Sequence, residues 1–262
     1  MLSKNKIKFI QSLARKKNRE AEKLFLVEGD KMVVEVLESS LSVRLLAATE
    51  EFLAVTDRVT SSQPVSSGRA AEVVEASAEE IRKASLLQSP QHALAVVEMP
   101  QTEFEQSILA NQLSLALDFI QDPGNLGTII RLADWFGIEH LLCSENTVDC
   151  FNPKVIQASM GAIFRVKVHY LNLPEVLGKA QAEKLPVYGA FLEGENIYDR
   201  NLSQAGILVM GNEGNGISPE VEQTVTEKIH IPSFASGGNG SESLNVSMAT
   251  GICLSEFRRR KN

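Results

Sequence analysis

Strand and helix signals alternate from Gln112 to the end of the chain, and this alternation constrains the fold more than any other feature. Short apolar runs bounded by turn residues predict buried strands, and apolar residues at helical spacing predict helices between them. Such an order favours an α/β fold, in which helices cover both faces of a mostly parallel sheet. The predicted strands are Leu113–Ile120, His140–Cys143, Phe164–His169, Val187–Phe191, Ile207–Met210 and Lys228–Ile231, and the predicted helices are Leu126–Phe136, Pro153–Met160, Pro174–Lys184, Pro219–Thr226 and Leu244–Arg259.

The first hundred residues predict a smaller α/β unit of their own. An amphipathic helix is expected over Lys6–Glu22, and a second over Lys31–Glu38 with Asp30 as its cap. The polar segment Met99–Asn111 contains Pro100 and separates two strand-rich blocks, so we expect a domain at 1–100, a linker at 101–111 and a second domain at 112–262. The strands predicted in the first domain are Phe25–Val27, Val43–Ala48, Ala71–Glu75 and Ala93–Val97, and Ser61–Gly68 is a predicted loop.

Composition limits the class of protein. With 262 residues, 44% of them hydrophobic and 23% charged, the chain suits one large or two modest globular domains. No apolar run is long enough for a transmembrane helix, and the first residues lack the apolar core of a signal peptide, so a cytoplasmic protein is expected. Three cysteines without a C-x-x-C spacing and four scattered histidines predict neither a disulfide framework nor a metal site.

Charge is unevenly distributed. Residues 1–23 carry eight basic and two acidic side chains, a local charge of +6, although the whole chain has a net charge of −7. A second basic run, Arg258–Lys261, lies near the C-terminus. Electrostatic fields act within about 10 Å at ordinary ionic strength, so a local basic patch can bind phosphates on an acidic protein. A solvated, helix-supporting charge face explains the N-terminal cluster equally well.

Six residues, Gly211 to Gly216, follow the buried strand Ile207–Met210 and contain three glycines. Glycines after a strand expose backbone N–H groups and let a ligand approach closely. The order of glycines matches neither the dinucleotide fingerprint nor a Walker A loop, and no lysine is present for a phosphate. By itself such a segment is more often a structural turn than a ligand site, and a residue such as Glu213 is more often a surface carboxylate than a functional one. If the segment does bind a phosphate, a nucleotide-binding α/β enzyme is one hypothesis for the chain.

Two further segments contain polar residues at helix starts. Asn125, in a compact turn, is a plausible N-cap, and Arg131 lies almost two turns into the following helix. Its guanidinium suits a ribose–phosphate backbone, although an ion pair with Asp134 is the simpler local reading. Near the C-terminus Ser243 is a predicted N-cap, whereas Asn245 would lie in the first turn, where asparagine lowers helix propensity. That cost favours a functional role for Asn245.

In chain order, the segment with Asn125 and Arg131, the glycine-rich segment and the segment with Ser243 and Asn245 resemble the motifs of the SpoU (TrmH) family of RNA ribose 2′-O-methyltransferases, within the SPOUT superfamily. The resemblance is close from Leu113 to the C-terminus and loose over the first hundred residues. It implies that the second domain is an α/β knot, a deep trefoil knot in which the last helix threads through a loop. It also implies an L30e-like substrate-binding domain at the N-terminus.

The resemblance further implies S-adenosyl-L-methionine as cofactor and a ribose 2′-hydroxyl as methyl acceptor. Arg131 would act as a base or, since a guanidinium rarely loses its proton, by stabilising the developing alkoxide. The residues implied at the active site are Arg131, Asn125, Glu213, Ser243 and Asn245, and those at the cofactor are Gly211, Ile231, Leu244, Met210 and Gly216.

Partners also follow from the resemblance. Family members are typically homodimers through the knot domain, and the accessory domain points to structured RNA, rRNA of the 23S type more than tRNA. No membrane and no metal are expected. The connection Ser233–Glu242 is about four residues longer than usual in the family and rich in glycine, so a non-catalytic RNA-binding or assembly factor on the same fold is the alternative.

Overall fold

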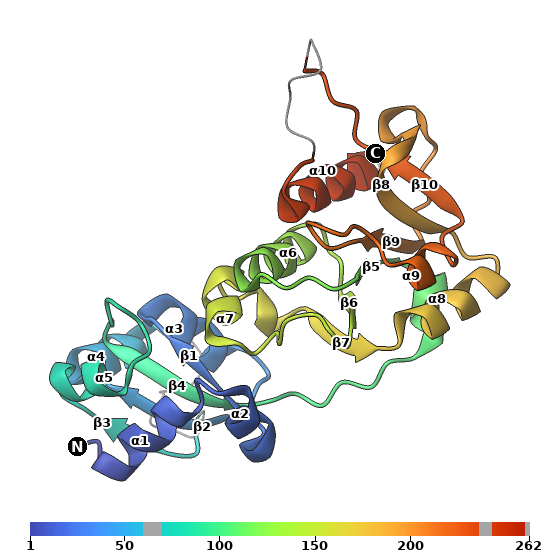
Figure 1. Cartoon of the computed structure of the whole chain (residues 1–262). Coiled ribbons are helices and arrows are strands. Elements are labelled where there is room, and N and C mark those ends of the chain that lie inside the picture. The colour runs from blue at the N-terminus through green and yellow to red at the C-terminus, as the bar shows by residue number, and fades with distance from the viewer. Residues whose placement is uncertain (60–69, 236–242, 260–262) are drawn as a thin grey trace. The chain divides into compact units, whose positions relative to one another are not determined.

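The computed structural model describes residues 1–59, 70–235 and 243–259 (Figure 1). It divides into two compact units, one of Met1–Gln101 with Phe151–Phe164 and one of Thr102–Cys150 with Arg165–Asn262. The loop predicted at Ser61–Gly68, most of the glycine-rich connection and the last residues of the C-terminal basic run lie outside the described residues.

The N-terminal unit is built on a mixed sheet with the strand order β1-β4-β2-β3. Strand β4 is antiparallel to β1 and β2, and β3 is parallel to β2. Its strands are β1 (Leu24–Glu28), β2 (Val43–Ala48), β3 (Val73–Glu75) and β4 (Ala93–Glu98), and its helices are α1 (Lys4–Ser12), α2 (Lys16–Glu22), α3 (Asp30–Glu38), α4 (Glu50–Val59), α5 (Ala78–Ala84) and α7 (Pro153–Ser159).

Two predictions for this unit are wrong. The single helix expected over Lys6–Glu22 is two helices, α1 and α2, because the chain turns after Ser12. Asp30 is the first residue of α3 and Gly29 is its N-cap; the Asp30 carboxylate instead accepts a bond from the His92 backbone N–H at 2.9 Å. Helices α4 and α5 were not predicted, although Ser77 and Glu80 form a full capping box at the start of α5.

Helix α7 packs with the N-terminal unit although it lies far along the chain. The rings of Phe151 and Phe25 are 4.7 Å apart between centroids, and the Gln157 side chain donates to the Glu28 carbonyl at 3.0 Å. Gly161, at the end of this segment, has a left-handed φ of +87° that favours glycine, and the Glu35 carboxylate of α3 lies against it. Residues 151–164 therefore complete the packing over β1.

The C-terminal unit holds a six-stranded sheet in the order β10-β8-β9-β5-β6-β7, in which every neighbouring pair is parallel. The class expected from the alternation of elements is the one observed. The strands are β5 (Leu113–Leu117), β6 (His140–Ser144), β7 (Lys167–Leu171), β8 (Val187–Asn196), β9 (Gly206–Met210) and β10 (Glu227–His230), and the helices are η2 (Gln106–Ala110), α6 (Pro123–Trp135), α8 (Leu173–Ala182), η4 (Ile197–Asp199), α9 (Pro219–Glu222) and α10 (Val246–Arg259). The short helix η3 (Ala162–Phe164) belongs to the N-terminal unit.

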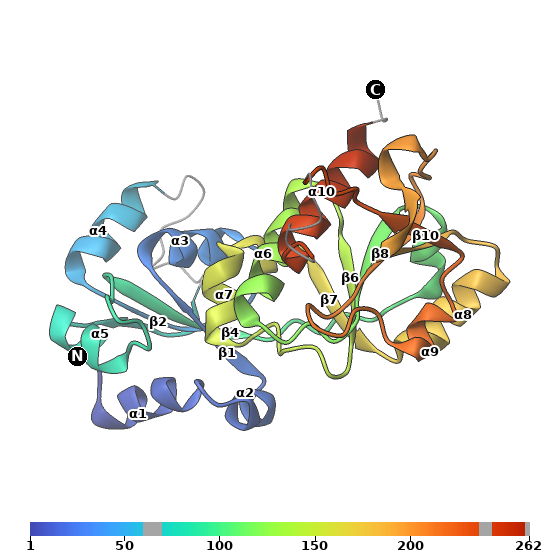
Figure 2. The same cartoon turned by 45° about the horizontal axis from the view of Figure 1, so that its top comes forward.

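Helices cover both faces of this sheet. Helices η2, α8 and α9 pack with Ala116, Val187 and Val209 in one apolar core. Helices α6 and α10 pack side by side over the other face, as Figures 1 and 2 show, where Phe257 of α10 meets the ring of Tyr188 edge-on at 5.1 Å. In the part of the chain that the structure describes, no helix is long and apolar enough to cross a membrane.

Candidate functional site

Three polar side chains from distant parts of the chain form a connected set. Asn125 donates through Nδ2 to Oε1 of Glu213, and its Oδ1 accepts a hydrogen bond from Nδ2 of Asn245 at 3.0 Å. The partners are 88 and 120 residues away in sequence, so only the fold brings them together. Because the Glu213 carboxylate can only accept while ionised, the orientation of the Asn125 amide is fixed by the chemistry of its neighbours.

Asn125 is free to reach these partners because another residue caps α6. Oδ1 of Asp122 accepts the Asn125 backbone N–H at 2.8 Å, and Pro123 occupies the first turn. Asn125 itself is therefore inside the helix, and its expected role as N-cap is wrong. The side-chain amide of Asn125, which an N-cap residue would use to bind the helix backbone, is therefore available to Glu213 and Asn245.

The expected cap of the last helix is wrong as well. Helix α10 begins at Val246, and Oδ1 of Asn245 accepts the backbone N–H groups of Ser247 at 3.0 Å and Met248 at 3.3 Å. The Ser247 hydroxyl donates to the same oxygen at 2.6 Å. Asn245 thus caps α10 with its oxygen and binds Asn125 with its nitrogen, while Ser243 is exposed two residues before it.

The glycine-rich segment is a closed turn whose shape requires glycine. Asn212 and Gly216 exchange two backbone hydrogen bonds of 2.9 Å, and the Asn212 side chain accepts from the N–H groups of Gly214 and Asn215. A Cβ on Gly211 would lie 2.3 Å from the carbonyl carbon of Gly216, and Gly216 has a φ of +70°. The turn holds Glu213 beside Asn125.

Sequence reasoning missed the residues that anchor this turn. Nδ2 of Asn212 donates to the Phe119 carbonyl at 2.9 Å, and the buried carboxylate of Asp118 accepts the Ser218 N–H at 2.7 Å. Phe119 has a left-handed φ of +62°, which is uncommon for a bulky residue. The available signal was position, because Asp118 and Phe119 directly follow a buried strand, where parallel sheets place functional groups.

The five residues expected at the cofactor lie at strand and helix ends. Met210 is the last residue of β9 and is buried; Gly211 and Gly216 open and close the turn that follows. Ile231 directly follows β10, and Leu244 directly precedes Asn245. Since β9, β8 and β10 are parallel neighbours, Met210 and Ile231 lie at the same carboxyl edge of the sheet.

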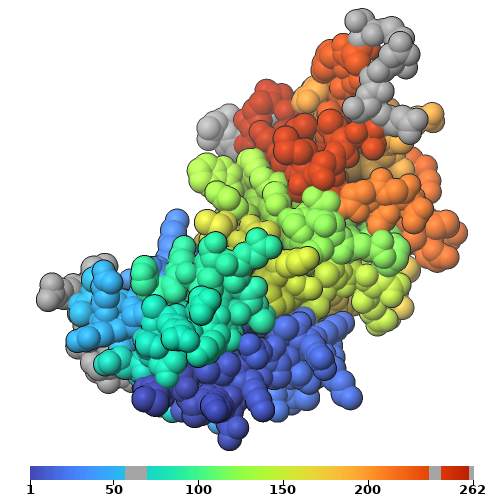
Figure 3. Space-filling model, turned by 60° about the vertical axis from the view of Figure 1, so that its left-hand side comes forward, coloured from blue at the N-terminus to red at the C-terminus, as the bar shows by residue number. Residues whose placement is uncertain are grey.

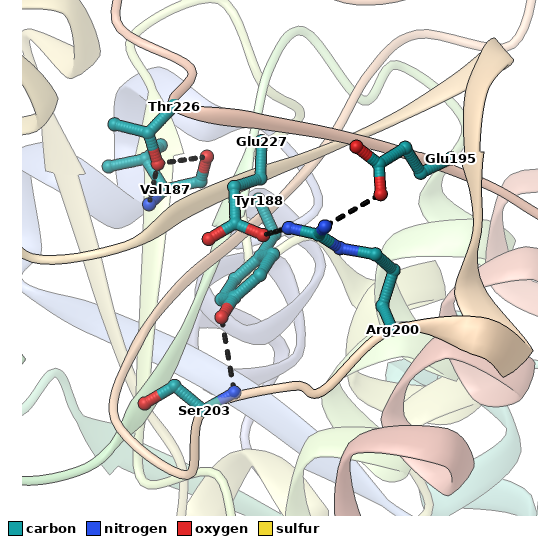
Figure 4. Close-up of polar contacts among 7 residues, drawn as sticks. All are labelled: Val187, Tyr188, Glu195, Arg200, Ser203, Thr226 and Glu227. Carbon is teal, nitrogen blue, oxygen red and sulfur yellow. Dashed lines mark hydrogen bonds and ion pairs between the residues drawn. The ribbon is translucent and has the colours of Figure 1, made fainter.

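Figure 4 shows a polar network that ties β8 to β10. Arg200 donates to Glu195 of β8 at 2.6 Å and to Glu227 of β10, and the Tyr188 hydroxyl accepts the Ser203 N–H at 3.1 Å. Close by, the Thr226 hydroxyl accepts from the Val187 N–H at 2.9 Å. These contacts fix the strand that delivers Ile231, across a register shift in the β8–β10 pairing.

Arg131 stands apart from the connected set. It is exposed on α6 and makes no hydrogen bond or ion pair with the described residues, and Ser243 has none either. The simple local reading of Arg131, an ion pair with Asp134, is wrong, because Asp134 receives two hydrogen bonds from Nε of Arg165 and a third from its Nη2. The guanidinium of Arg131 is therefore available to a ligand or a partner.

Two observations bear on what the site could hold. Nδ1 of His230, the residue before Ile231, is buried and has no hydrogen-bond partner among the described residues. Such an atom costs free energy until a ligand or water satisfies it. In the described part of the chain, no group of three or more His, Cys, Asp or Glu side chains could hold a metal ion.

Comparison with known proteins decides the family. The model of the SpoU rRNA methylase family matches residues 112–255, and the model of an MRM3-like substrate-binding domain matches residues 4–95. The chain belongs to the SpoU rRNA methylase family. In the SpoU chain, the connected set is formed by the three motif segments that carry the resemblance in sequence.

Relatives span the whole length of the SpoU chain. The 23S rRNA (guanosine(2553)-2′-O)-methyltransferase RlmP of Bacillus subtilis is 30% identical over 97% of this chain and 96% of its own. A structure from Porphyromonas gingivalis, assigned to the TrmH family of RNA methyltransferases, is 42% identical with a TM-score of 0.86 and covers 99% of both chains. An S-adenosylmethionine-bound rRNA methyltransferase from Sinorhizobium meliloti is 27% identical with a TM-score of 0.80, over 99% of this chain and 97% of that one.

These findings confirm four predictions made from the sequence. The family and its α/β knot fold class are confirmed by the family model and by the structural likeness over the full length. The class of enzyme, an RNA ribose 2′-O-methyltransferase, and S-adenosylmethionine as cofactor are confirmed by family membership, the full-length relative and the cofactor-bound structure.

Proposed function

We propose that this SpoU protein methylates a ribose 2′-hydroxyl in rRNA of the 23S type, in the cytoplasm, at a site formed by Asn125, Arg131, Glu213, Ser243 and Asn245. Residues 112–262 would form the catalytic domain, and residues 1–100 an L30e-like domain that binds the RNA. The observation that carries the proposal is the connected set, because Asn125, Glu213 and Asn245 converge from three segments and fix one another.

The carboxyl edge of the sheet fits S-adenosylmethionine. We assign its binding to Met210, Gly211, Gly216, Ile231 and Leu244. The tight glycine turn has no side chains at Gly211, Gly214 and Gly216, and Nδ1 of His230, which has no partner in the part of the chain that the structure describes, adjoins Ile231. Bound S-adenosylmethionine supplies an electrophilic methyl group, so the protein needs chiefly to position the ribose hydroxyl and assist the loss of its proton. Positioning of this kind can contribute about 7–11 kcal/mol.

Within this scheme Arg131 stabilises negative charge on the attacking oxygen. A guanidinium keeps its proton in proteins, and its five N–H donors can bind the ribose oxygen and a neighbouring phosphate together. Arg131 is exposed and has no partner among the described residues, which suits a group that binds RNA. Asn125 and Asn245 are held by hydrogen bonds before substrate arrives, so they orient the ribose without reorganisation.

A homodimer would complete the site. Trp135 lies one helical turn after Arg131 on the same face of α6 and is 83% exposed, and Met248 of the neighbouring α10 is 63% exposed. Large exposed apolar side chains on two packed helices are typical of a protein interface. We propose that a second copy covers this face and thereby encloses Arg131.

The specific target is suggested by the full-length relative. RlmP of Bacillus subtilis is named for guanosine 2553 of 23S rRNA. A transcript of 23S rRNA around this position is therefore the first substrate to test, with tritiated S-adenosylmethionine as methyl donor. Incorporation that resists alkaline hydrolysis at one nucleotide would identify a 2′-O-methyl product, because a methylated 2′-oxygen cannot attack the adjacent phosphate.

The decisive variant is Arg131→Ala. We expect methyl transfer to fall by about 10²- to 10³-fold, as for the loss of one group that stabilises an oxyanion. Binding of S-adenosylmethionine, measured by calorimetric titration with ATP as the control ligand, should stay unchanged. Unaltered turnover in Arg131→Ala would remove this residue from the mechanism. Wild-type protein that is folded and dimeric but binds no S-adenosylmethionine would favour the non-catalytic RNA-binding factor.

A further inference from the structure

The turn between α1 and α2 presents three cations whose side chains donate no hydrogen bond to the described residues. Arg15, Lys16 and Lys17 are all exposed (Figure 3 shows the dark blue N-terminal residues on the surface). Lys16 has one loose ion pair, with Glu20 at 3.6 Å between two side chains that are each 58% exposed. Arg15 is the N-cap residue of α2 but makes no capping hydrogen bond. Among the described residues, Lys17 has no ion pair.

Buried polar side chains hold this turn rigidly. Arg19 is 1% exposed, and its Nη1 donates to the carbonyls of Leu13 and Ala14, both at 2.8 Å. Asn18 donates to the Ser12 carbonyl at 2.9 Å. These carbonyls follow the end of α1, where backbone acceptors lack helical partners. The turn is therefore fixed from beneath, and Arg19, counted in the basic cluster from the sequence, serves the fold.

Helix support does not explain the three exposed cations. A helix macrodipole favours acidic residues in the first turn and basic residues in the last. Helix α2 has the opposite arrangement: its first turn holds Lys16 and Lys17 with no acidic residue, and the basic residue of its last turn is the buried Arg19. The cations are therefore placed where they disfavour the helix, which points to a partner outside the fold.

The remaining charge of this unit narrows where that partner could bind. A hollow of about 820 Å³ is lined by Glu50, Glu51, Glu75, Glu79 and Glu80 together with Lys83, His92 and the N-terminus. A polyanion would be repelled from this hollow and attracted to the α1–α2 turn. Within the N-terminal unit, the α1–α2 turn is therefore suited to nucleic acid and the acidic hollow is not.

We propose that the α1–α2 turn is a contact for the phosphate backbone of the RNA substrate, with Arg15, Lys16 and Lys17 on the phosphates and Arg19 as the positioning residue beneath them. This proposal rests on the proposed function, because the substrate is taken to be structured RNA. It assigns this surface to affinity and register, since phosphate contacts position an RNA without reading its sequence.

A matched pair of double variants tests the surface. Lys16→Ala/Lys17→Ala and Arg82→Ala/Lys83→Ala each remove two adjacent exposed cations from the same unit, so the change in net charge is equal. Binding of each protein to the 23S rRNA transcript around guanosine 2553 is followed by fluorescence anisotropy across a series of KCl concentrations. Thermal unfolding and titration with S-adenosylmethionine are measured on the same preparations.

We expect Lys16→Ala/Lys17→Ala to bind the transcript about 10- to 30-fold more weakly at about 0.1 M KCl, with a log–log salt slope shallower by about 1.5, because two phosphate contacts are lost. The Arg82/Lys83 variant should keep the wild-type slope. Equal slopes in the two variants would overturn the proposal. Binding of S-adenosylmethionine distinguishes failure of this proposal from failure of the proposed function. If both variants bind S-adenosylmethionine and have equal salt slopes, the methyltransferase function stands and only the phosphate contact at the α1–α2 turn is rejected.

Discussion

In the C-terminal unit, the polar side chains of the site are hydrogen-bonded to one another. The exposed cations of the α1–α2 turn in the N-terminal unit have only the loose ion pair of Lys16 with Glu20 among the described residues. Asn125, Glu213 and Asn245 form the connected set, in which Asn125 bonds to both of the others across three segments. Arg15 and Lys17 make no polar side-chain contact with the described residues, and their position is set by the buried Arg19 beneath the turn.

The difference matches two kinds of task. Chemistry on one ribose oxygen requires groups held within a fraction of an ångström, so their partners must be in place before substrate binds. Contact with a phosphate backbone requires only that positive charge be displayed at the right distance, because the Coulomb term changes slowly with position. Substitutions should therefore affect rate in one unit and affinity in the other.

The largest expected effect concerns the support of the turn. Arg19→Met keeps the apolar stem but removes two charge-assisted hydrogen bonds to backbone carbonyls, so the free energy of unfolding should fall by about 3 kcal/mol. Chemical denaturation measures this change. Lys17→Met is the control, because an exposed side chain without partners should leave stability within about 0.5 kcal/mol. Equal stability of the two variants would refute the supporting role of Arg19.

The next largest effect is expected when a negative charge is introduced into the connected set. Asn125→Asp places a second carboxylate against Glu213, and like charges at hydrogen-bond distance repel. Methyl transfer should fall by about 100-fold, with S-adenosylmethionine binding little changed. Adding Glu213→Gln to Asn125→Asp restores a donor–acceptor pair and should recover part of the rate. If the second substitution lowers activity further, Glu213 has a role beyond holding Asn125.

The smallest effect is a dependence of stability on pH in the C-terminal unit. Nδ1 of His140 and Nε2 of His169 are 3.0 Å apart and share one proton, and both rings are buried. Burial, with the charges of His140 and Lys167, lowers the pKa of His169 to about 4. Burial and Lys167 lower the pKa of His140 too, while Glu139 opposes this shift.

A histidine whose pKa is lowered by folding stays neutral while the unfolded chain takes up a proton. Stability from this pair is therefore fully present above about pH 6.5 and is lost as the pH falls towards 4. Denaturation curves at several pH values should show less of this loss in His169→Gln, which can still accept or donate a hydrogen bond. His92→Gln is the control, since Asp30 raises the pKa of that exposed histidine and its contribution has the opposite sign.

Much of the fold was predictable because it depends on local patterns. The parallel sheet followed from buried strands that alternate with helices, and β5, β6 and β9 lie close to their predicted positions. The break between α1 and α2 was not predictable in this way. No glycine or proline marks it, and the contacts that hold it come from the Arg19 side chain, which bonds to the carbonyls of Leu13 and Ala14.

The motifs predicted that Asn125, Glu213 and Asn245 come together, but they did not predict which residues cap the two helices. Asn125 and Asp122 are both good caps, and Pro123 was the local signal that the helix starts after Asp122. For α10, Ser243 and Asn245 are equivalent by cap preference. Asn245, and not Ser243, caps α10, and Asn245 also bonds to Asn125. That contact spans 120 residues, so no local sequence pattern contains it.

The packing of Phe151–Phe164 into the N-terminal unit has a consequence for synthesis on the ribosome. Domains usually fold in order as they emerge, each as soon as its own residues are available. Here the Phe25 ring packs against Phe151, and the Glu28 carbonyl accepts a hydrogen bond from Gln157. At a translation rate of about 5–20 residues per second, the unit that begins the chain must wait about 3–12 s after its sheet has been made. The N-terminal unit therefore cannot complete its packing until residues 151–164 have been synthesised.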